Sequence, residues 1–394
     1  MSSNWKNYNL IDLCDYFNDG NWIETKDQST NGIRLIQTGN IGNGIYLDKL
    51  NAAKYISEDT FKRLNCSEVY PNDILISRLP KPVGRACVIP DLKTKMITAV
   101  DCTIVRVNKQ ICDYRFLLFS LMNDTYFNQV NKLIAGSTRE RISRSNLENI
   151  KLSIPSLEEQ ERIVKIIESK LTAVEKAKKA SDEQIAIFRR LFISYIENIF
   201  KNGNWNKIKL KEICNFINGD AYKDIDWSNA GIPIVRIQNL NNINKPFNYW
   251  AGTTEDRITI DNNDLLLAWS GTPGTSFGAH IWNRGFALLN QHIFKVVYNE
   301  KSANPIWLKY AINQILSIMI EKSHGAVGLR HITKPEVENL EILLPPLDEQ
   351  IKIVNYLETI SNAVENVKKV IKEQSTYINA LPSSILRKAF NGDY

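Results

Sequence analysis

One stretch occurs twice in this 394-residue chain, and its first copy reads Leu147-Glu-Asn-Ile-Lys-Leu-Ser-Ile-Pro155-Ser-Leu-Glu-Glu-Gln160-Glu-Arg-Ile-Val164. The second copy reads Val337-Glu-Asn-Leu-Glu-Ile-Leu-Leu-Pro345-Pro-Leu-Asp-Glu-Gln350-Ile-Lys-Ile-Val354. Nine of the 22 positions from 147 to 168 are identical to those from 337 to 358, which is far more than chance produces. A repeat at a long fixed spacing decides the architecture before any single motif does.

A second match extends the repeat to the start of each half. The first half begins with Trp5-Lys-Asn-Tyr-Asn-Leu10 and then Leu13-Cys14-Asp-Tyr-Phe-Asn18. The second half has Trp205-Asn-Lys-Ile-Lys-Leu210 and then Ile213-Cys214-Asn-Phe-Ile-Asn218 at the corresponding places. The chain therefore predicts a pseudo-twofold object in which a globular head, a Pro-containing junction and a long helix occur twice. We place the first head at 1–152, the first helical spacer at 153–202, the second head at 203–342, and the second helical spacer with a C-terminal tail at 343–394.

Short β-branched apolar runs, bounded by Gly and Asn clusters, indicate strands in both heads. The clearest runs are Ile33 to Ile36, Ile74 to Ile76, Ala86 to Ile89 and Thr103 to Val107, and in the second head Ile234 to Ile237, Leu265 to Leu267 and Ile293 to Val297. Each head closes with a helical stretch, Tyr114 to Leu133 and Pro305 to Lys322. We therefore expect the α+β fold class for each head.

Both junctions lead into long helices with a coiled-coil pattern. From Leu157 to Phe200 there is no Gly or Pro, and apolar residues alternate at three- and four-residue steps. The predicted seam positions are Val164, Ile167, Leu171, Val174, Ile185, Phe188 and Phe192, and in the second helix Leu357, Ile360, Val364, Val367, Ile371, Gln374, Ile378 and Leu381. The two helices most simply pack as an antiparallel coiled coil. Pro382 should end or kink the second helix, leaving Ser383 to Phe390 as a short terminal helix.

Composition excludes several classes of protein. With 43% hydrophobic and 23% charged residues the chain is of the globular class, and no apolar run reaches the roughly 20 residues that span a bilayer. The start has no secretory signal, and the six cysteines lack any C-x-x-C pair, so reduced thiols and a cytoplasmic location are expected. The net charge of +6 fits a nucleic-acid partner without requiring one, because 203–341 holds 14 basic and 13 acidic residues.

The usual catalytic signatures are missing from the sequence. The Gly-rich stretch Gly271 to Gly278 lacks the Lys-Ser/Thr of a phosphate-binding loop, and no Asn-Pro-Pro-Tyr-like tetrapeptide occurs. The four histidines show no metal-ligand spacing, and Pro90-Asp91 has no acidic-x-Lys partner at nuclease spacing. We therefore expect neither enzymatic activity nor a metal or cofactor on this chain.

The chain resembles type I restriction-modification specificity subunits over nearly its whole length. The resemblance lies in the duplicated motifs Pro155-Ser-Leu-Glu-Glu-Gln160-x-x-Ile-Val and Pro345-Pro-Leu-Asp-Glu-Gln350-x-x-Ile-Val, and in the ending Leu386-Arg-Lys-Ala-Phe390-Asn-Gly392. The resemblance implies two target recognition domains, each reading one half of a bipartite asymmetric site in double-stranded DNA. It also implies two methylation subunits docked along the helices, which use S-adenosylmethionine to modify adenine at N6. Restriction subunits, with ATP and Mg²⁺, can join such complexes.

Polar loops at matching places in the two heads supply the candidate DNA-binding residues, because base edges are read by Arg, Asn and Gln side chains while Lys and Arg on phosphate position the protein. The candidates are Arg78, Lys81, Arg85, Ser137, Thr138, Arg139, Arg141 and Arg144 in the first head, and Trp269, Ser270, Thr272, Thr275, Ser276, Arg330, His331 and Lys334 in the second. Gln37, Asn40, Gln238 and Asn239 are secondary candidates. Replacing Arg139 or Arg330 with alanine should cost about 1–3 kcal/mol of binding if the side chain reads a base.

Two other classes of function stay open at this point. One is a self-contained DNA methyltransferase or nuclease with unrecognised motifs, which the purified chain alone would reveal by methylating or cleaving DNA. The other is a protein-interaction scaffold built on the coiled coil, which would bind no DNA either alone or with a methylation subunit.

Overall fold

The computed structural model describes residues 5–136, 140–270, 277–322 and 332–393. It divides into two compact units, one made of Met1–Asp182 with Lys372–Tyr394 and the other of Glu183–Ile371. Two long helices, α5 (Leu157–Asn202) and α9 (Leu347–Asn391), each contribute one part to both units. Each unit therefore holds one head together with a stretch of each long helix.

The first head combines a four-stranded antiparallel sheet, a five-stranded mixed sheet and a two-stranded ribbon. The four-stranded sheet has the order β2 (Cys14–Asp19), β10 (Cys102–Val107), β7 (Ile74–Ser77), β8 (Ala86–Val88). The mixed sheet has the order β3 (Gln28–Ser29), β5 (Lys54–Ile56), β4 (Ile33–Ile36), β9 (Met96–Thr98), β6 (Glu68–Val69). The ribbon pairs β1 (Lys6–Asn9) with β11 (Lys151–Ile154). The α-helices are α1 (Glu58–Arg63), α2 (Tyr114–Ser120), α3 (Asp124–Leu133) and α4 (Arg144–Glu148), and short 3-10 turns lie at Leu10–Leu13, Thr25–Asp27, Thr38–Asn40 and Leu50–Ala52.

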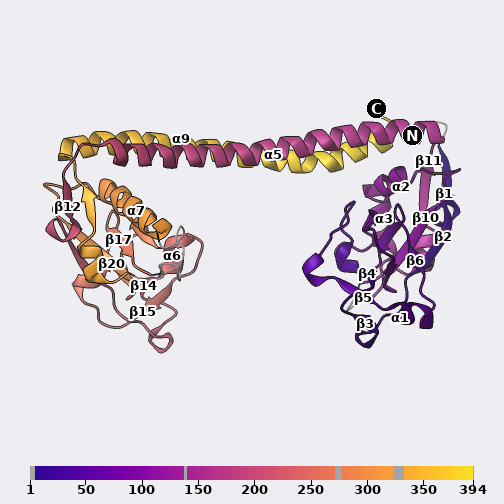
Figure 1. Ribbon diagram of the computed structural model, residues 1–394, viewed down its shortest axis with the longest axis horizontal. Helices are drawn as coiled ribbons and strands as arrows, with labels where there is room; N and C mark the ends of the chain where they lie inside the picture. Colours follow the sequence, from indigo (N-terminus) through magenta and orange to yellow (C-terminus); the bar gives the residue numbers. More distant parts are fainter. Residues whose placement is uncertain (1–4, 137–139, 271–276, 323–331, 394) are drawn as a thin grey trace. The chain divides into compact units, whose positions relative to one another are not determined.

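The second head repeats this plan. Its antiparallel sheet has the order β13 (Cys214–Asn218), β20 (Ile293–Tyr298), β17 (Leu265–Ala268), β18 (Gly278–Ile281). Its mixed sheet has the order β15 (Asn248–Trp250), β14 (Ile232–Val235), β19 (Ala287–Leu289), β16 (Thr259–Ile260), and its ribbon pairs β12 (Lys207–Lys209) with β21 (Glu341–Leu343). The helices are α6 (Ile237–Asn241), α7 (Pro305–Lys322) and α8 (Lys334–Glu338), with 3-10 turns at Leu210–Glu212, Asp224–Asp226 and Asp256–Ile258. In Figure 1, α7 lies alongside the sheet that contains β17 and β20. The predicted α+β class and the internal repeat are confirmed.

Two boundaries differ from the sequence-based expectation. The helical stretch expected from Tyr114 to Leu133 is divided into two helices. Asn123 caps the start of α3, because its side-chain oxygen accepts from the Thr125 amide at 2.9 Å. The strand expected to reach Ile237 ends at Val235, and Ile237 begins α6 instead. The hydrogen bond of the Asn123 side chain decides the first boundary, and the pattern of hydrophobic residues gives no sign of that bond.

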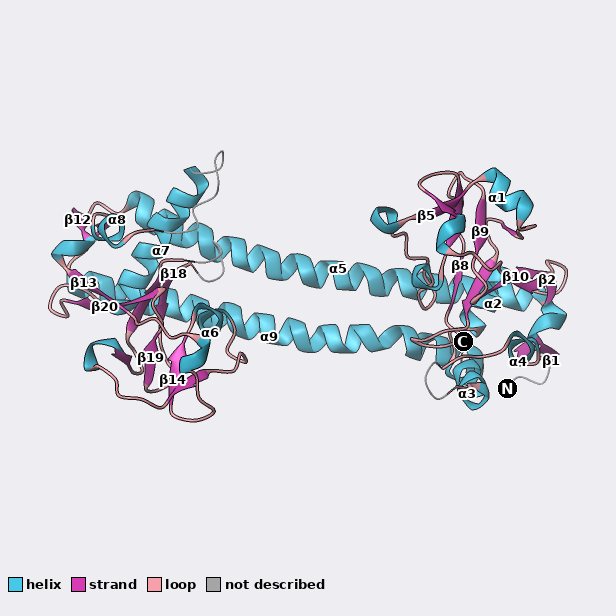
Figure 2. Ribbon diagram, turned by 90° about the horizontal axis from the view of Figure 1, so that it is seen from below, coloured by secondary structure: helices cyan, strands magenta, loops and turns pink. Residues whose placement is uncertain are grey.

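The coiled-coil seam follows the predicted spacing over α5. In the second unit α5 and α9 lie side by side in opposite directions, since Tyr195 near the end of α5 contacts Tyr356 near the start of α9, with ring centroids 5.4 Å apart (Figure 2). In α9 two predicted seam positions were wrong, because Gln374 and Leu381 are exposed. The step after Ile371 is four residues instead of three, so the half-buried positions are Ser375 and Ile378.

Pro382 does not end α9, and Ser383 to Phe390 do not form a separate terminal helix, contrary to that part of the expectation from sequence. The helix continues to Asn391, and its last two turns bury Ile385, Leu386 and Ala389 in the core of the first head. A proline inside a helix costs about 3 kcal/mol, and burial of these three side chains offsets that cost. Tertiary packing therefore overrides the local preference.

The duplicated junction motif has one structural purpose in both units. Gln160 is fully buried, its Oε1 accepts from the Asp113 amide at 2.8 Å, and its Nε2 donates to the carbonyls of Ile111 and Pro155 at 3.0 Å each. Gln350 repeats this pattern with the Asn304 amide and the carbonyls of Ser302 and Pro345, all at 2.8 Å. The glutamine therefore ties each long helix to its head, which explains why the motif occurs twice.

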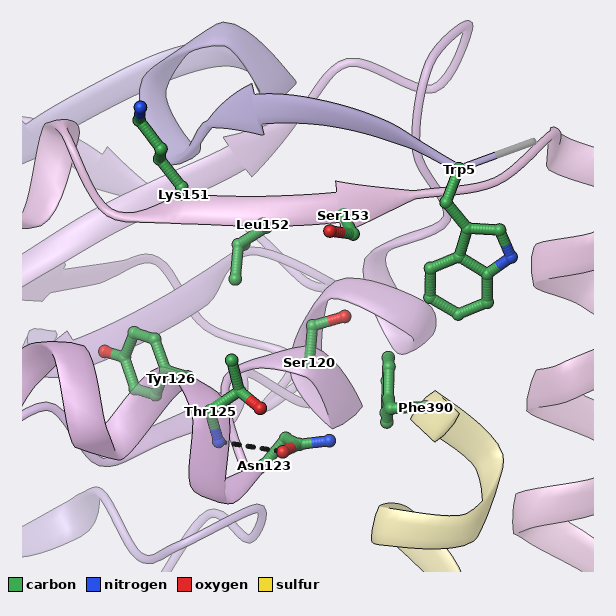
Figure 3. A pocket seen from close by; sticks show the side chains of 9 residues that line it. All are labelled: Trp5, Ser120, Asn123, Thr125, Tyr126, Lys151, Leu152, Ser153 and Phe390. Carbon is green, nitrogen blue, oxygen red and sulfur yellow. Dashed lines mark hydrogen bonds between the residues drawn. The ribbon is translucent and has the colours of Figure 1, made fainter. Parts of the chain in front are cut away.

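A trio of aromatic rings closes each head against the end of a long helix. In the first unit Phe116 lies 6.0 Å from Trp5 and 5.3 Å from Phe390 of α9 (Figure 3 shows Trp5 and Phe390). In the second unit Trp307 takes the place of Phe116, with Trp205 at 5.5 Å and Phe200 of α5 at 4.9 Å. The end of α9 therefore supplies an aromatic ring to the core of the first head, and the end of α5 supplies one to the core of the second.

The thiols are predicted to be chemically inert in the folded chain. Burial raises the pKa of the Cys14, Cys87, Cys102, Cys112 and Cys214 thiols to about 12. Burial also raises the pKa of the Cys66 thiol. Because the thiolate is the reactive form, a disulfide reagent at pH 8 should modify none of the six quickly, and all six after denaturation. Rapid reaction of even one thiol in the native chain would contradict this prediction.

Candidate nucleic-acid interface

Strand register places two predicted residues, Arg78 and Trp269, at the same point of the two heads. In the first sheet Thr103 of β10 pairs with Asp19 on one side and Ile76 on the other. In the second sheet Phe294 of β20 pairs with Asn218 and Leu267. Two residues beyond Ile76 and Leu267 stand Arg78 and Trp269. Both heads therefore present a side chain directly after the same strand, next to the end of β2 or β13.

The main chain at this point is held identically in both heads. The Arg78 amide donates to the Asp101 carbonyl at 2.9 Å, and the Arg78 carbonyl accepts from Ile142 at 3.2 Å. The Trp269 amide donates to the His292 carbonyl at 3.3 Å, and the Trp269 carbonyl accepts from Ile332 at 3.1 Å. Each position therefore joins three segments: the central strand, the turn before β10 or β20, and the segment that leads into α4 or α8.

The side chains of the first head form an ionic cluster. Arg78 is 6% exposed, and its Nη2 lies 2.9 Å from Asp19 Oδ2 and donates to the Val100 carbonyl at 2.7 Å. Asp19 Oδ1 also accepts from the Thr103 hydroxyl at 2.8 Å. Burial lowers the pKa of the Arg78 guanidinium, and the carboxylate of Asp19 opposes that shift. Arg141 forms a second ion pair here, 3.2 Å from Asp101.

The same positions in the second head form an aromatic cluster. The Trp269 ring stacks on Phe294 with centroids 5.9 Å apart, and it meets the His292 ring edge-to-face with centroids 5.2 Å apart. The indole Nε1 donates to Asn218 Oδ1 at 3.3 Å, where the first head has the Arg78–Asp19 ion pair. Among the described residues, neither Arg78 Nε nor His292 Nδ1 has a hydrogen-bond partner, although both atoms are buried. One scaffold therefore carries two different chemistries at one place.

The other described candidates divide by exposure. Arg141 and Arg144 in the first head and Lys334 in the second have side chains 45%, 42% and 45% exposed. Arg144 and Lys334 begin α4 and α8, where they pair with Glu148 at 3.1 Å and Glu338 at 3.7 Å. Arg144 also donates to the Asn18 side chain. Lys81 is exposed and Ser270 is buried. Four of these candidates are therefore exposed cations, namely Lys81, Arg141, Arg144 and Lys334.

Three candidates have side chains that are used within the fold. Arg85 is buried and donates to the carbonyls of Thr38, Ile41, Leu79 and Pro82 at 2.6–3.0 Å, which uses four of its five N–H groups. Asn40 Oδ1 accepts from the Gln37 amide at 3.0 Å, and Asn239 Oδ1 accepts from the Arg236 amide at 3.0 Å. These contacts favour a role in shaping the turns after β4 and β14. Gln37 is half-buried and Gln238 is exposed.

Eight of the predicted residues lie outside the described part of the chain. They are Ser137, Thr138, Arg139, Thr272, Thr275, Ser276, Arg330 and His331.

Sequence reasoning missed the residues that hold the two clusters, namely Asp19, Asp101, Asn218 and His292. The repeat aligns Asn18 with Asn218, but a register shift between Arg106 and Val107 in the β10–β2 pairing makes Asp19 the counterpart of Asn218. A β-bulge of this kind inserts one residue and re-aims the next side chain. Only the pairing pattern reveals it.

The described residues include no cluster of three or more His, Cys, Asp or Glu side chains that could hold a metal ion. Within the same residues, every helix is too short or too polar to cross a membrane.

Comparison with known proteins identifies the class of chain that has this plan. The model of the type I restriction modification DNA specificity domain matches twice, at residues 2–184 and 202–374, so the chain belongs to that family. The StySPI specificity subunit of Salmonella potsdam and the EcoKI specificity subunit of Escherichia coli K12 are each 22% identical over 93% of this chain and 85% of their own length. The EcoBI specificity subunit of Escherichia coli is 26% identical over 48% of this chain and 39% of its own length.

Solved structures have the same fold. The HsdS subunit from Thermoanaerobacter tengcongensis superposes with a TM-score of 0.61 at 18% identity, covering 100% of this chain and 98% of the other. A chain from a study of the assembly and conformational transition of a type I R-M system gives 0.76 at 19% identity, covering 100% and 99%. These neighbours, with the tandem domains, confirm two similar heads joined by paired long helices.

Proposed function

We propose that this specificity subunit reads a bipartite DNA site, one half with each head, and that it performs no catalysis itself. The observation that carries the proposal is the strand-end position described above, where one scaffold presents Arg78 with Asp19 in one head and Trp269 with Asn218 in the other. Two copies of one fold with different chemistry at one place suit the reading of two different half-sites. Arg141, Arg144 and Lys334 would supply charge to the DNA in the same regions.

The long helices would set the distance between the half-sites and dock two methylation subunits. A groove of about 490 Å³ in the second unit supports docking, because it lies between α5 and α9 and is lined by Ile187, Phe188, Val367 and Val370. Ile187 and Val370 are 46% and 51% exposed, so the groove offers apolar surface that a partner could cover. S-adenosylmethionine, and ATP with Mg²⁺ where restriction subunits join, would be bound by those partners.

Mapping of N6-methyladenine in a host that expresses this chain with its methylation subunit tests the proposal. The expected result is one new bipartite motif with a fixed spacer and a methylated adenine in each half. The methylation subunit alone serves as the control and should add no motif. A folded, bound complex that methylates nothing new would overturn the proposal, as would methylation or cleavage of DNA by this chain alone.

A further inference from the structure

Two equivalent residues at the strand ends differ between the heads. Asp19 ends β2 and pairs with Thr103, whereas Asn218 ends β13 and pairs with Phe294. Asp19 carries a charge that binds buried Arg78, whereas Asn218 is neutral and accepts from the Trp269 indole. Both residues nevertheless contact the side chain that follows β7 or β17. Both heads have this contact, but it is an ion pair in the first head and a neutral hydrogen bond in the second.

The contact is connected to an exposed cation by a short chain of bonds. The Arg78 carbonyl holds the Ile142 amide at 3.2 Å, and the neighbouring Arg141 exchanges two main-chain hydrogen bonds with Ala135, each 2.9 Å. The Arg141 guanidinium is 45% exposed and 3.2 Å from Asp101. A shift of the Arg78 main chain therefore reaches Arg141 through Ile142, its neighbour in the chain.

We propose that Asp19 in the first head and Asn218 in the second are positioning residues for base reading, each acting on its own half-site only. They hold the side chains of Arg78 and Trp269, and through the main chain the segments that lead into α4 and α8. The inference rests on the proposed function, which it deepens by assigning residues that do not themselves touch DNA.

Loss of the Asp19 carboxylate leaves the Arg78 guanidinium buried without its counter-ion, since that side chain is only 6% exposed. A buried unpaired charge moves towards water, and Ile142 and Arg141 would move with it. Reading should then become less selective in one half-site. Since one mismatched base pair is typically discriminated by about tenfold or more, loss of one reading contact should raise the share of off-consensus bases at that position by about tenfold.

The test compares variants by the methylation pattern that they leave on host genomic DNA. Asp19→Leu should relax one half of the motif about tenfold and leave the other half at its wild-type stringency, while Asn218→Leu should relax the opposite half. Asp19→Asn keeps a hydrogen-bond acceptor for Arg78 and Thr103 but removes the counter-ion, so it should relax the same half less than Asp19→Leu does. Asp91→Asn breaks the exposed Asp91–Lys93 pair in the same head and should change nothing.

A double variant separates reading from folding. Asp19→Leu with Arg78→Met removes both charges, so no buried charge is left unpaired and the head should stay folded. The Asp19–Arg78 contact that holds the segment before α4 is nevertheless absent, so the same half should still be relaxed. Three results would overturn the inference. They are an equal loss of selectivity in both half-sites, relaxation of the same half-site by both single leucine variants, and unchanged selectivity in the folded double variant. If the wild-type chain itself yields no bipartite motif, the proposed function fails, and this inference fails with it.

Discussion

Replacing Gln350 with leucine should lower the free energy of unfolding of the second unit by about 3 kcal/mol, because one buried and two half-buried main-chain groups each lose a partner worth about 1 kcal/mol or more. These groups are the Asn304 amide and the Ser302 and Pro345 carbonyls. Leucine fills nearly the same volume, so the loss reports hydrogen bonding and not a cavity. Gln160→Leu should do the same in the first unit.

Tryptophan fluorescence during urea denaturation is a suitable measurement for Gln350→Leu. Six of the eight tryptophans lie between 205 and 307, so the signal reports mainly on the second unit. Asn355→Leu is the matched control, since Asn355 is exposed on the same helix within the second unit and its replacement should cost less than about 0.5 kcal/mol. Equal midpoints for the two variants would show that the junction glutamine does not tie helix to head.

Deletion of residues 385–394 should destabilise the first unit strongly and leave the second unit intact. It removes the buried side chains of Ile385, Leu386 and Ala389, and the Phe390 ring that packs against Phe116. Burial of a large apolar side chain contributes about 1.5–3 kcal/mol, so the first head should lose about 4 kcal/mol or more. The second head obtains its equivalent ring, Phe200, from α5 and keeps it.

Hydrogen exchange can follow both heads in one sample. Amides of Phe116–Leu121 should exchange much faster in the truncated chain, whereas those of Trp307–Leu316 should keep their wild-type protection. Deletion of only Gly392–Tyr394 is the control and should leave both segments protected. Equal loss of protection in both heads would contradict the assignment of the C-terminal helix to the first head.

The sequence alone determined the duplicated plan, the strands of the central sheets and the seam of α5. These follow from repeat spacing and from hydrophobic periodicity, both of which are properties of local order along the chain. The resemblance in the two junction motifs also indicated the family. The function of the junction glutamines was not visible, since their partners lie 46–49 positions away in the chain for all but one bond each.

Tertiary structure alone decided three further points. It carried α9 through Pro382, because burial against the first head outweighs a local helix-breaking preference. It placed Arg85 among four carbonyls, although its residue type suggested a contact with bases. It paired Asp19 with Arg78 and Asn218 with Trp269, because the bulge in β2 shifts the repeat by one residue. Each of these depends on contacts between distant segments, which no local pattern encodes.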